Sequence, residues 1–140
     1  MNATELLQVQ VHLDCDTAHA WATYTEPSAI VRWNFAVPQW HCPRAENDLR
    51  VGGMLRTRME ARDGSMGFDF EGTYTEVVPL QRLAYALGPD RQVTADFSAA
   101  GGGTDVVVRF TSDGTVPAPA QIEGWQAILN NYKAIAERSA

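Results

Sequence analysis

Residues Pro119 to Ser139 have the sequence PAQIEGWQAILNNYKAIAERS, and the rest of the 140-residue chain is arranged around them. Their apolar residues recur at alternating spacings of three and four, which is the period of an amphipathic helix. Pro119 suits the first turn, where its missing N–H has no partner to lose. Lys133 and Arg138 lie near the other end, where cations complement the helix dipole. The expected apolar face consists of Ile122, Trp125, Ile128, Leu129, Tyr132, Ile135 and Ala136.

The segment before this helix, from Met54 to Ser112, is predicted to be a run of strands. Apolar and polar residues alternate along it, and turn signals interrupt it at Asp63-Gly64, at Gly88-Pro89 and at Gly101 to Gly103. Alternation with turns at this spacing predicts an antiparallel sheet. The alternation slips at Val77-Val78, where we expect a β-bulge.

The N-terminal third contains a strand, two short helices and a long connection. Leu7 to Leu13 alternate with polar residues, which predicts a half-buried strand. Ala18 to Thr25 and Pro27 to about Trp33 predict two short helices. Asn34 to Arg50 has no regular pattern but carries bulky aromatic residues, so we expect a long functional loop there.

This order of elements predicts an α+β fold in a single domain, residues 1–140. It comprises one strand, two short helices, about five further strands and one long helix, so the antiparallel sheet has about six strands. A sheet bent around one helix does not close tightly everywhere, so we expect a cavity between them.

Composition excludes several classes of partner. The formal net charge of -6 argues against binding to nucleic acid and to anionic membranes. No stretch approaches the ~20 apolar residues of a membrane span, and Met1 to Leu13 lacks the basic start and apolar run of a secretory signal. Cys15 and Cys42 form no CxxC motif, and two free thiols fit a reducing compartment. We therefore expect a cytoplasmic protein without membrane insertion.

Short pieces along nearly the whole chain carry a family resemblance: Ala20-Trp21, Thr25 to Pro27, Trp33, Asp48 to Gly53, Met59 to Gly64, Phe68 to Tyr74, Val78-Pro79, Arg82-Leu83, and Gly124-Trp125 with Leu129. In their order and spacing they resemble the START-related (SRPBCC, birch-pollen-allergen-like) superfamily, and more narrowly the family of activator of Hsp-90 ATPase homologues. The resemblance implies the helix-grip fold, in which a curved antiparallel sheet wraps around a long C-terminal helix. It also implies similarity to lipid-binding, polyketide-handling and stress-related proteins.

In a helix-grip fold, core aromatic residues also line the pocket, so the resemblance implies a set of candidate ligand-binding residues. Tyr85 and Tyr132 carry hydroxyls that need partners when buried, so they are the candidates for orienting the polar end of a ligand. Arg91 is a weaker candidate, and Met54 and Met66 are expected to face inward with Met59. The candidate cavity lining is Trp33, Phe35, Trp40, Met59, Phe68, Phe70, Tyr74, Tyr85, Phe97, Trp125, Leu129 and Tyr132.

No catalytic residue, metal site or cofactor motif is identified. His12 and His19 flank a strand end and do not converge as metal ligands do. His41 is interpreted as a loop residue, with a place at the cavity mouth as the alternative. Adjacent residues such as His41 and Cys42 seldom form a catalytic dyad. Asp69 and Glu71 share an outward strand face, where ion pairs with Arg56, Arg58 and Arg62 are expected to be worth under about 1 kcal/mol each.

Our leading hypothesis is a binding protein for a small apolar molecule, lipid-like or aromatic, held between the sheet and the C-terminal helix. One alternative is a protein-interaction module, either a homodimer or a chaperone regulator, that docks through the apolar segment Phe35 to Trp40. The other is a cyclase or hydrolase that uses a Tyr or His in the pocket. An enzyme of that kind requires a strongly perturbed ionisable group facing the cavity.

Overall fold

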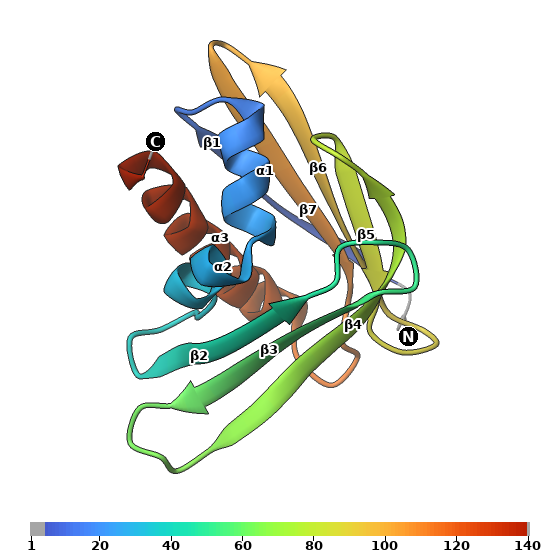
Figure 1. The fold of residues 1–140 in the computed structure, drawn as a ribbon. Coiled ribbons are helices and arrows are strands. Elements are labelled where there is room, and N and C mark those ends of the chain that lie inside the picture. Colours follow the sequence, from blue (N-terminus) through green and yellow to red (C-terminus); the bar gives the residue numbers. More distant parts are fainter. Residues whose placement is uncertain (1–4, 140) are drawn as a thin grey trace.

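The computed structural model describes residues 5–139 and shows one antiparallel sheet of seven strands with three helices on one side (Figure 1). The strand order across the sheet is β1-β7-β6-β5-β4-β3-β2. The elements in chain order are β1 (Leu6–Leu13), α1 (Thr17–Thr25), α2 (Pro27–Trp33), β2 (Trp40–Asn47), β3 (Met54–Ala61), β4 (Gly67–Val78), β5 (Arg82–Ala86), β6 (Gln92–Ala100), β7 (Gly103–Thr111) and α3 (Ala118–Arg138).

The sheet curls into a half-barrel, and α3 lies along its concave side (Figure 1). The helix packs mainly on β1 at one edge of the sheet, with α1 and α2 beside it. These two short helices connect β1 to β2, which form the two opposite edges. The predicted α+β helix-grip architecture is therefore confirmed.

Many of the fully buried residues lie on the strands that α1 and α3 cover. Leu13, Val93, Val106 and Phe110 are fully buried, and they come from β1, β6 and β7. From α3, Tyr132 is also fully buried, because it lies on the apolar face that the helical period predicts.

Hydrogen bonds from α3 tie it to the N-terminal elements. The Tyr132 hydroxyl donates to the carbonyl oxygen of Ala20 on α1 at 2.6 Å. The Asn131 side chain donates to the carbonyl oxygen of Phe35, just after α2, at 2.6 Å. Both bonds involve the C-terminal half of α3, so its N-terminal half is left to face the strands.

The number of strands differs from the prediction because the expected loop contains β2. This strand pairs with β3, and its register shifts between His41 and Arg44. It carries Pro43 and lies at the sheet edge, so only Cys42 of its eight residues is buried. An edge strand with a proline and a bulge has no regular alternation, and the sequence therefore concealed it.

Three smaller expectations also require correction. The bulge in β4 lies between Tyr74 and Glu76, slightly before the predicted Val77-Val78. Met54 and Met66 do not face inward, since 41% and 65% of their surfaces are exposed. Ile122 is 36% exposed, so the apolar face of α3 begins one turn later than predicted.

Candidate functional site

A cavity of about 200 Å³ lies between α3, the two short helices and the concave side of the sheet. It is partly open to solvent, and the side chain of Phe68, which is 51% exposed, lies at its rim. The side chains that line the cavity are Val9, Tyr24, Ile30, Trp33, Asn34, Leu55, Thr57, Met59, Phe68, Phe70, Tyr74, Leu83, Tyr85, Val108, Trp125, Ile128 and Leu129.

The structure brings two thirds of the candidate residues to this cavity. Those that line it are Trp33, Met59, Phe68, Phe70, Tyr74, Tyr85, Trp125 and Leu129, and those that do not are Phe35, Trp40, Phe97 and Tyr132. Whether the lining residues contact a ligand stays a prediction.

Three of the four candidates outside the lining pack against other aromatic rings. Phe97 and Tyr132 pack against the ring of Tyr24, with centroids 5.5 and 5.1 Å from it, and Tyr24 itself lines the cavity. The Tyr132 hydroxyl already has the Ala20 carbonyl as its partner, so this tyrosine is not available to orient a ligand. Trp40 packs against Phe68, with the two ring centroids 5.9 Å apart.

Three polar residues of the lining were missed by sequence reasoning. Tyr24 lies on α1, Asn34 follows α2, and Thr57 lies on β3. Thr57 lies two residues from both Leu55 and Met59 on the same strand, so its side chain shares their face. Its inward direction was therefore predictable from the sequence. Nothing in the sequence shows that Tyr24 and Asn34 reach the same space, because they come from helices whose packing is tertiary.

A glycine on β4 makes room for the aromatic ring of Tyr85. A Cβ atom added at Gly72 would lie 2.5 Å from the Tyr85 ring, closer than any real contact of that kind. Gly72 pairs with Leu55 of β3, two residues from Thr57, so the Tyr85 ring lies across β4 toward β3. Tyr85 and Thr57 therefore belong to the same wall of the cavity.

Tyr74 is the one cavity tyrosine that has a side-chain partner. Its hydroxyl donates to Asn47 Oδ1 at 2.7 Å, and Asn47 Nδ2 donates to the carbonyl oxygen of Thr25 at 2.7 Å. These two hydrogen bonds connect β4, β2 and the end of α1. Within the described residues, the hydroxyls of Tyr24 and Tyr85 have no such partner.

The cavity environment keeps its tyrosines protonated. Burial is the main cause that raises the pKa of Tyr85 well above its usual range, and the neighbouring Tyr24 and Tyr74 phenols raise it further. Burial also raises the pKa of Tyr24, and it raises the pKa of Tyr74 to about 12 despite the opposing hydrogen bond with Asn47. All three phenols are therefore neutral hydrogen-bonding groups near neutral pH.

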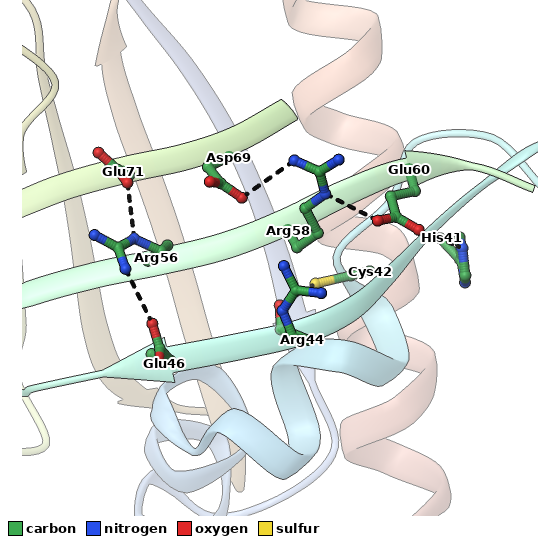
Figure 2. Close-up of polar contacts among 9 residues, drawn as sticks. All are labelled: His41, Cys42, Arg44, Glu46, Arg56, Arg58, Glu60, Asp69 and Glu71. Atoms are coloured by element: carbon green, nitrogen blue, oxygen red, sulfur yellow. Dashed lines mark hydrogen bonds and ion pairs between the residues drawn. The ribbon is translucent and has the colours of Figure 1, made fainter. Parts of the chain in front are cut away.

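The opposite side of β2, β3 and β4 carries a lattice of ion pairs (Figure 2). Arg56 binds Glu71 at 2.7 Å and Glu46 at 3.4 Å, while Arg58 lies 2.9 Å from Glu60 and 3.5 Å from Asp69. The predicted pairing of Asp69 and Glu71 with the arginines is confirmed. Solvent screens ion pairs on an exposed strand face, so each of them adds little to the stability of the fold.

Arg62 and Arg91 do not take the roles expected of them. Arg62 donates to the carbonyl oxygen of Pro38 at 2.8 Å instead of joining the ion pairs. Arg91 lies outside the cavity lining, and its Nε is buried without a partner among the described residues.

The histidines also lie away from the cavity. His12 contacts Asp105 at 2.7 Å, and His19 donates to the Ala136 carbonyl oxygen at 2.9 Å. His41 lies on β2, 3.8 Å from Glu60, which corrects both the loop and the cavity-mouth expectation. Among residues 5–139, no three His, Cys, Asp or Glu side chains are grouped as metal ligands.

None of the helices among residues 5–139 combines the length and the apolar character that a bilayer span requires.

Comparison with known proteins gives a family match and a set of similar structures. The family model described as "Activator of Hsp90 ATPase homolog 1-like protein" matches residues 14–137. Among curated proteins, none matches the chain.

Two solved structures share substantial sequence identity with the chain. A solution structure of an AHSA1-like protein from Aeromonas hydrophila is 35% identical, covers 96% of this chain and 94% of its own, and has a TM-score of 0.90. A protein from Cytophaga hutchinsonii is 39% identical over 94% of this chain and 92% of its own, with a TM-score of 0.81. A protein from Nitrosomonas europaea is 20% identical, covers 99% of this chain and 98% of its own, has a TM-score of 0.85 and shares the fold.

Proposed function

The chain belongs to the Activator of Hsp90 ATPase homolog 1-like family, and from this premise we propose that it binds a small, largely apolar molecule in the cavity between α3 and the sheet. The observation that carries the proposal is the cavity itself, which has room for a ligand and is lined mainly by aromatic and aliphatic side chains. Concave apolar sites with a few polar groups are the usual form of small-molecule sites.

The packing of α3 supports this proposal. The Trp125 ring stacks on Phe110 of β7 with centroids 4.3 Å apart and planes 11° apart. Trp125 and Ile128 also line the cavity, and they project from the half of α3 that has no hydrogen bond to α1 or α2. The stacked rings of Trp125 and Phe110 therefore fix α3 against β7 at the wall of the cavity.

The enzyme alternative receives no comparable support. Within the described residues, the cavity lining contains no His, Cys, Lys, Arg, Asp or Glu. Its ionisable groups are Tyr24, Tyr74 and Tyr85, and burial raises the pKa of each away from neutrality. A general base needs a pKa near the working pH, so binding is the function that this geometry favours.

The proposal predicts that a cavity ligand raises the thermal stability of the protein. A ligand present at 100 times its Kd stabilises the folded state by about 2.7 kcal/mol. Differential scanning fluorimetry and native mass spectrometry against lipids, sterols and small aromatic compounds measure this effect. Failure of every class to stabilise the protein would overturn the proposal.

Substitutions on the two faces of α3 locate the binding site. Ile128→Trp introduces a large ring into the cavity and should abolish the ligand-induced shift. Ile122→Trp makes the same change on the exposed face and should leave the shift unchanged. Leu55→Trp fills the cavity from β3 and should also abolish the shift. It provides the same test if the Ile128 variant does not fold. Equal shifts in the Ile128 and Ile122 variants would place the ligand elsewhere.

A further inference from the structure

The cavity combines apolar walls with hydroxyl groups that lack partners. Tyr24 and Tyr85 line it, and within residues 5–139 their hydroxyls form no hydrogen bond. Thr57, which is 1% exposed, also lines the cavity, and its Oγ1 is buried without a partner. Buried polar groups in native proteins are nearly always hydrogen-bonded, so the Thr57 hydroxyl lacks the partner that such a group usually has. The hydroxyls of Tyr24 and Tyr85 add two more hydrogen-bonding groups without a protein partner at the same cavity, and a polar atom of a bound molecule would satisfy them.

These hydroxyls come from facing elements. Tyr85 and Thr57 belong to the strand wall, while Tyr24 projects from α1, where its ring stacks on Trp33 at 5.3 Å. Both tyrosines line the same cavity, Tyr24 from the helix side and Tyr85 from the strand side. A ligand oxygen in this cavity can therefore accept a hydrogen bond from either side. Rotation of Thr57 about χ1 exchanges its methyl and hydroxyl groups and adds a third donor.

The charge of the lining selects against ions. Within the described residues no Lys, Arg or His reaches the cavity, so a bound carboxylate or phosphate has no cation to pair with. An unpaired buried charge is far more costly than a hydrogen-bonded neutral group. The raised pKa values of the phenols also keep their protons available for donation to a neutral oxygen.

The size and shape of the cavity select a ring system. A dry cavity of about 150 Å³ holds a benzene molecule, so the volume of about 200 Å³ suits one ring or two fused rings. The aromatic side chains Trp33, Phe70 and Trp125 contribute flat surfaces to the lining. Aromatic rings pair favourably with such surfaces in stacked and edge-to-face arrangements.

Resting on the proposed function, we propose that the ligand is an uncharged compound of one or two rings whose hydroxyl or carbonyl oxygen is held by Tyr85 and Tyr24, with Thr57 beside them. This narrows the ligand class from apolar molecules in general to neutral phenols and aromatic ketones. It excludes fatty acids and other anions, whose charge the lining does not match.

Four probes of graded chemistry test this proposal by isothermal titration calorimetry. They are naphthalene, 2-naphthol, 2-naphthoate and 1-decanol. The wild-type protein should bind 2-naphthol about tenfold more tightly than naphthalene, because one net hydrogen bond is worth close to a factor of ten. It should bind 2-naphthoate and 1-decanol more weakly than 2-naphthol.

Three Tyr→Phe variants with matched chemistry test whether the cavity hydroxyls cause this preference. Tyr85→Phe, with Tyr24→Phe as a second variant, removes a cavity hydroxyl and should reduce the preference for 2-naphthol over naphthalene by several-fold. Tyr132→Phe removes a buried hydroxyl that is bonded to Ala20 outside the cavity, so it should leave this preference unchanged.

The outcomes separate this inference from the function on which it rests. If 2-naphthoate or 1-decanol binds as tightly as 2-naphthol, the neutral-ring inference is overturned and the binding function stands. If 2-naphthol and naphthalene bind equally, water alone satisfies the hydroxyls and the inference is also overturned. If none of the four probes binds and no class of apolar compound stabilises the protein, both fail.

Discussion

Thr57 shows how one residue couples the stability of the protein to its cavity. Its side chain is 1% exposed, and its hydroxyl has no partner among the described residues. A buried hydroxyl without a partner costs about 1–3 kcal/mol. This hydroxyl lowers the stability of the fold, but it lies at the wall of a cavity. Its position therefore favours a role in ligand recognition over a role in stability.

We predict that Thr57→Val stabilises the ligand-free protein by about 1 kcal/mol, because it removes the unsatisfied hydroxyl and keeps the branched shape. Urea denaturation monitored by circular dichroism measures the change. Thr104→Val provides the matched control, since Thr104 is fully buried but donates to the Cys15 carbonyl oxygen at 2.9 Å. That substitution should destabilise by about 1–2 kcal/mol. Destabilisation of similar size in both variants would show that Thr57 is satisfied after all.

At the scale of elements, α3 holds the fold together through contacts on two sides. Its C-terminal half is bonded to α1 and to the end of α2 through Tyr132 and Asn131. Its N-terminal half is braced by the Trp125 ring on Phe110 of β7. The cavity opens beside that brace, so Trp125 serves both the attachment of the helix and the shape of the site.

We predict that Trp125→Ala lowers the free energy of unfolding by about 2–3 kcal/mol, because it removes a large ring that is partly buried. The same change should also weaken ligand binding. Ile122→Ala, at an exposed position one turn earlier, should cost under about 1 kcal/mol. Chemical denaturation of the two variants gives both values, and equal costs would show that the stacking on Phe110 does not anchor the helix.

At the scale of the whole molecule, the two sides of the half-barrel differ in how firmly they are packed. Fully buried residues such as Leu13, Val93 and Val106 lie in β1, β6 and β7, where α3 packs on β1 and α1 packs on β6 and β7. The strands β2 and β3 lie at the far edge, where β3 lines the cavity and most residues of both strands are at least partly exposed.

We predict that backbone amides of β2 and β3 exchange with solvent faster than those of β6 and β7, because fewer buried contacts oppose local opening there. Hydrogen–deuterium exchange with mass spectrometry measures these rates. Addition of 2-naphthol should slow exchange in β3 and β4, since a bound molecule fills the space between them and α3. Uniform protection across the sheet, with no response to 2-naphthol, would contradict this view of the molecule.

Much of the fold was predictable because local pattern and tertiary structure agree. Alternation on β1, β3, β6 and β7 marks strands that bury one face, and the period of three and four marks α3. The strand β2 was missed because Pro43, a register shift and an exposed edge position remove that alternation. Met54 and Met66 were misplaced because their apolar character was taken as a sign of burial, although they lie near strand ends.

The candidate site was only partly predictable for a different reason. Tyr74, Tyr85 and Trp125 were identified because large aromatic side chains on the inward face of an element are near any internal space. Tyr132 shares that character, yet it is bonded to Ala20, and this partner lies 112 residues away in the chain. Tyr24 and Asn34 reach the cavity from segments with no distinctive motif.

The sequence by itself determined six of the seven strands, the three helices and which of their faces are apolar, because each segment carries its periodicity alone. The order of these elements and the family resemblance predicted that a long C-terminal helix lies across a curved antiparallel sheet. Only the tertiary structure decided which polar side chains around the cavity find partners and which do not. A hydrogen bond depends on the position of two groups from distant segments. The buried Thr57 hydroxyl without a partner, and its place beside Tyr24 and Tyr85 at one cavity, therefore become visible only when those segments are packed together.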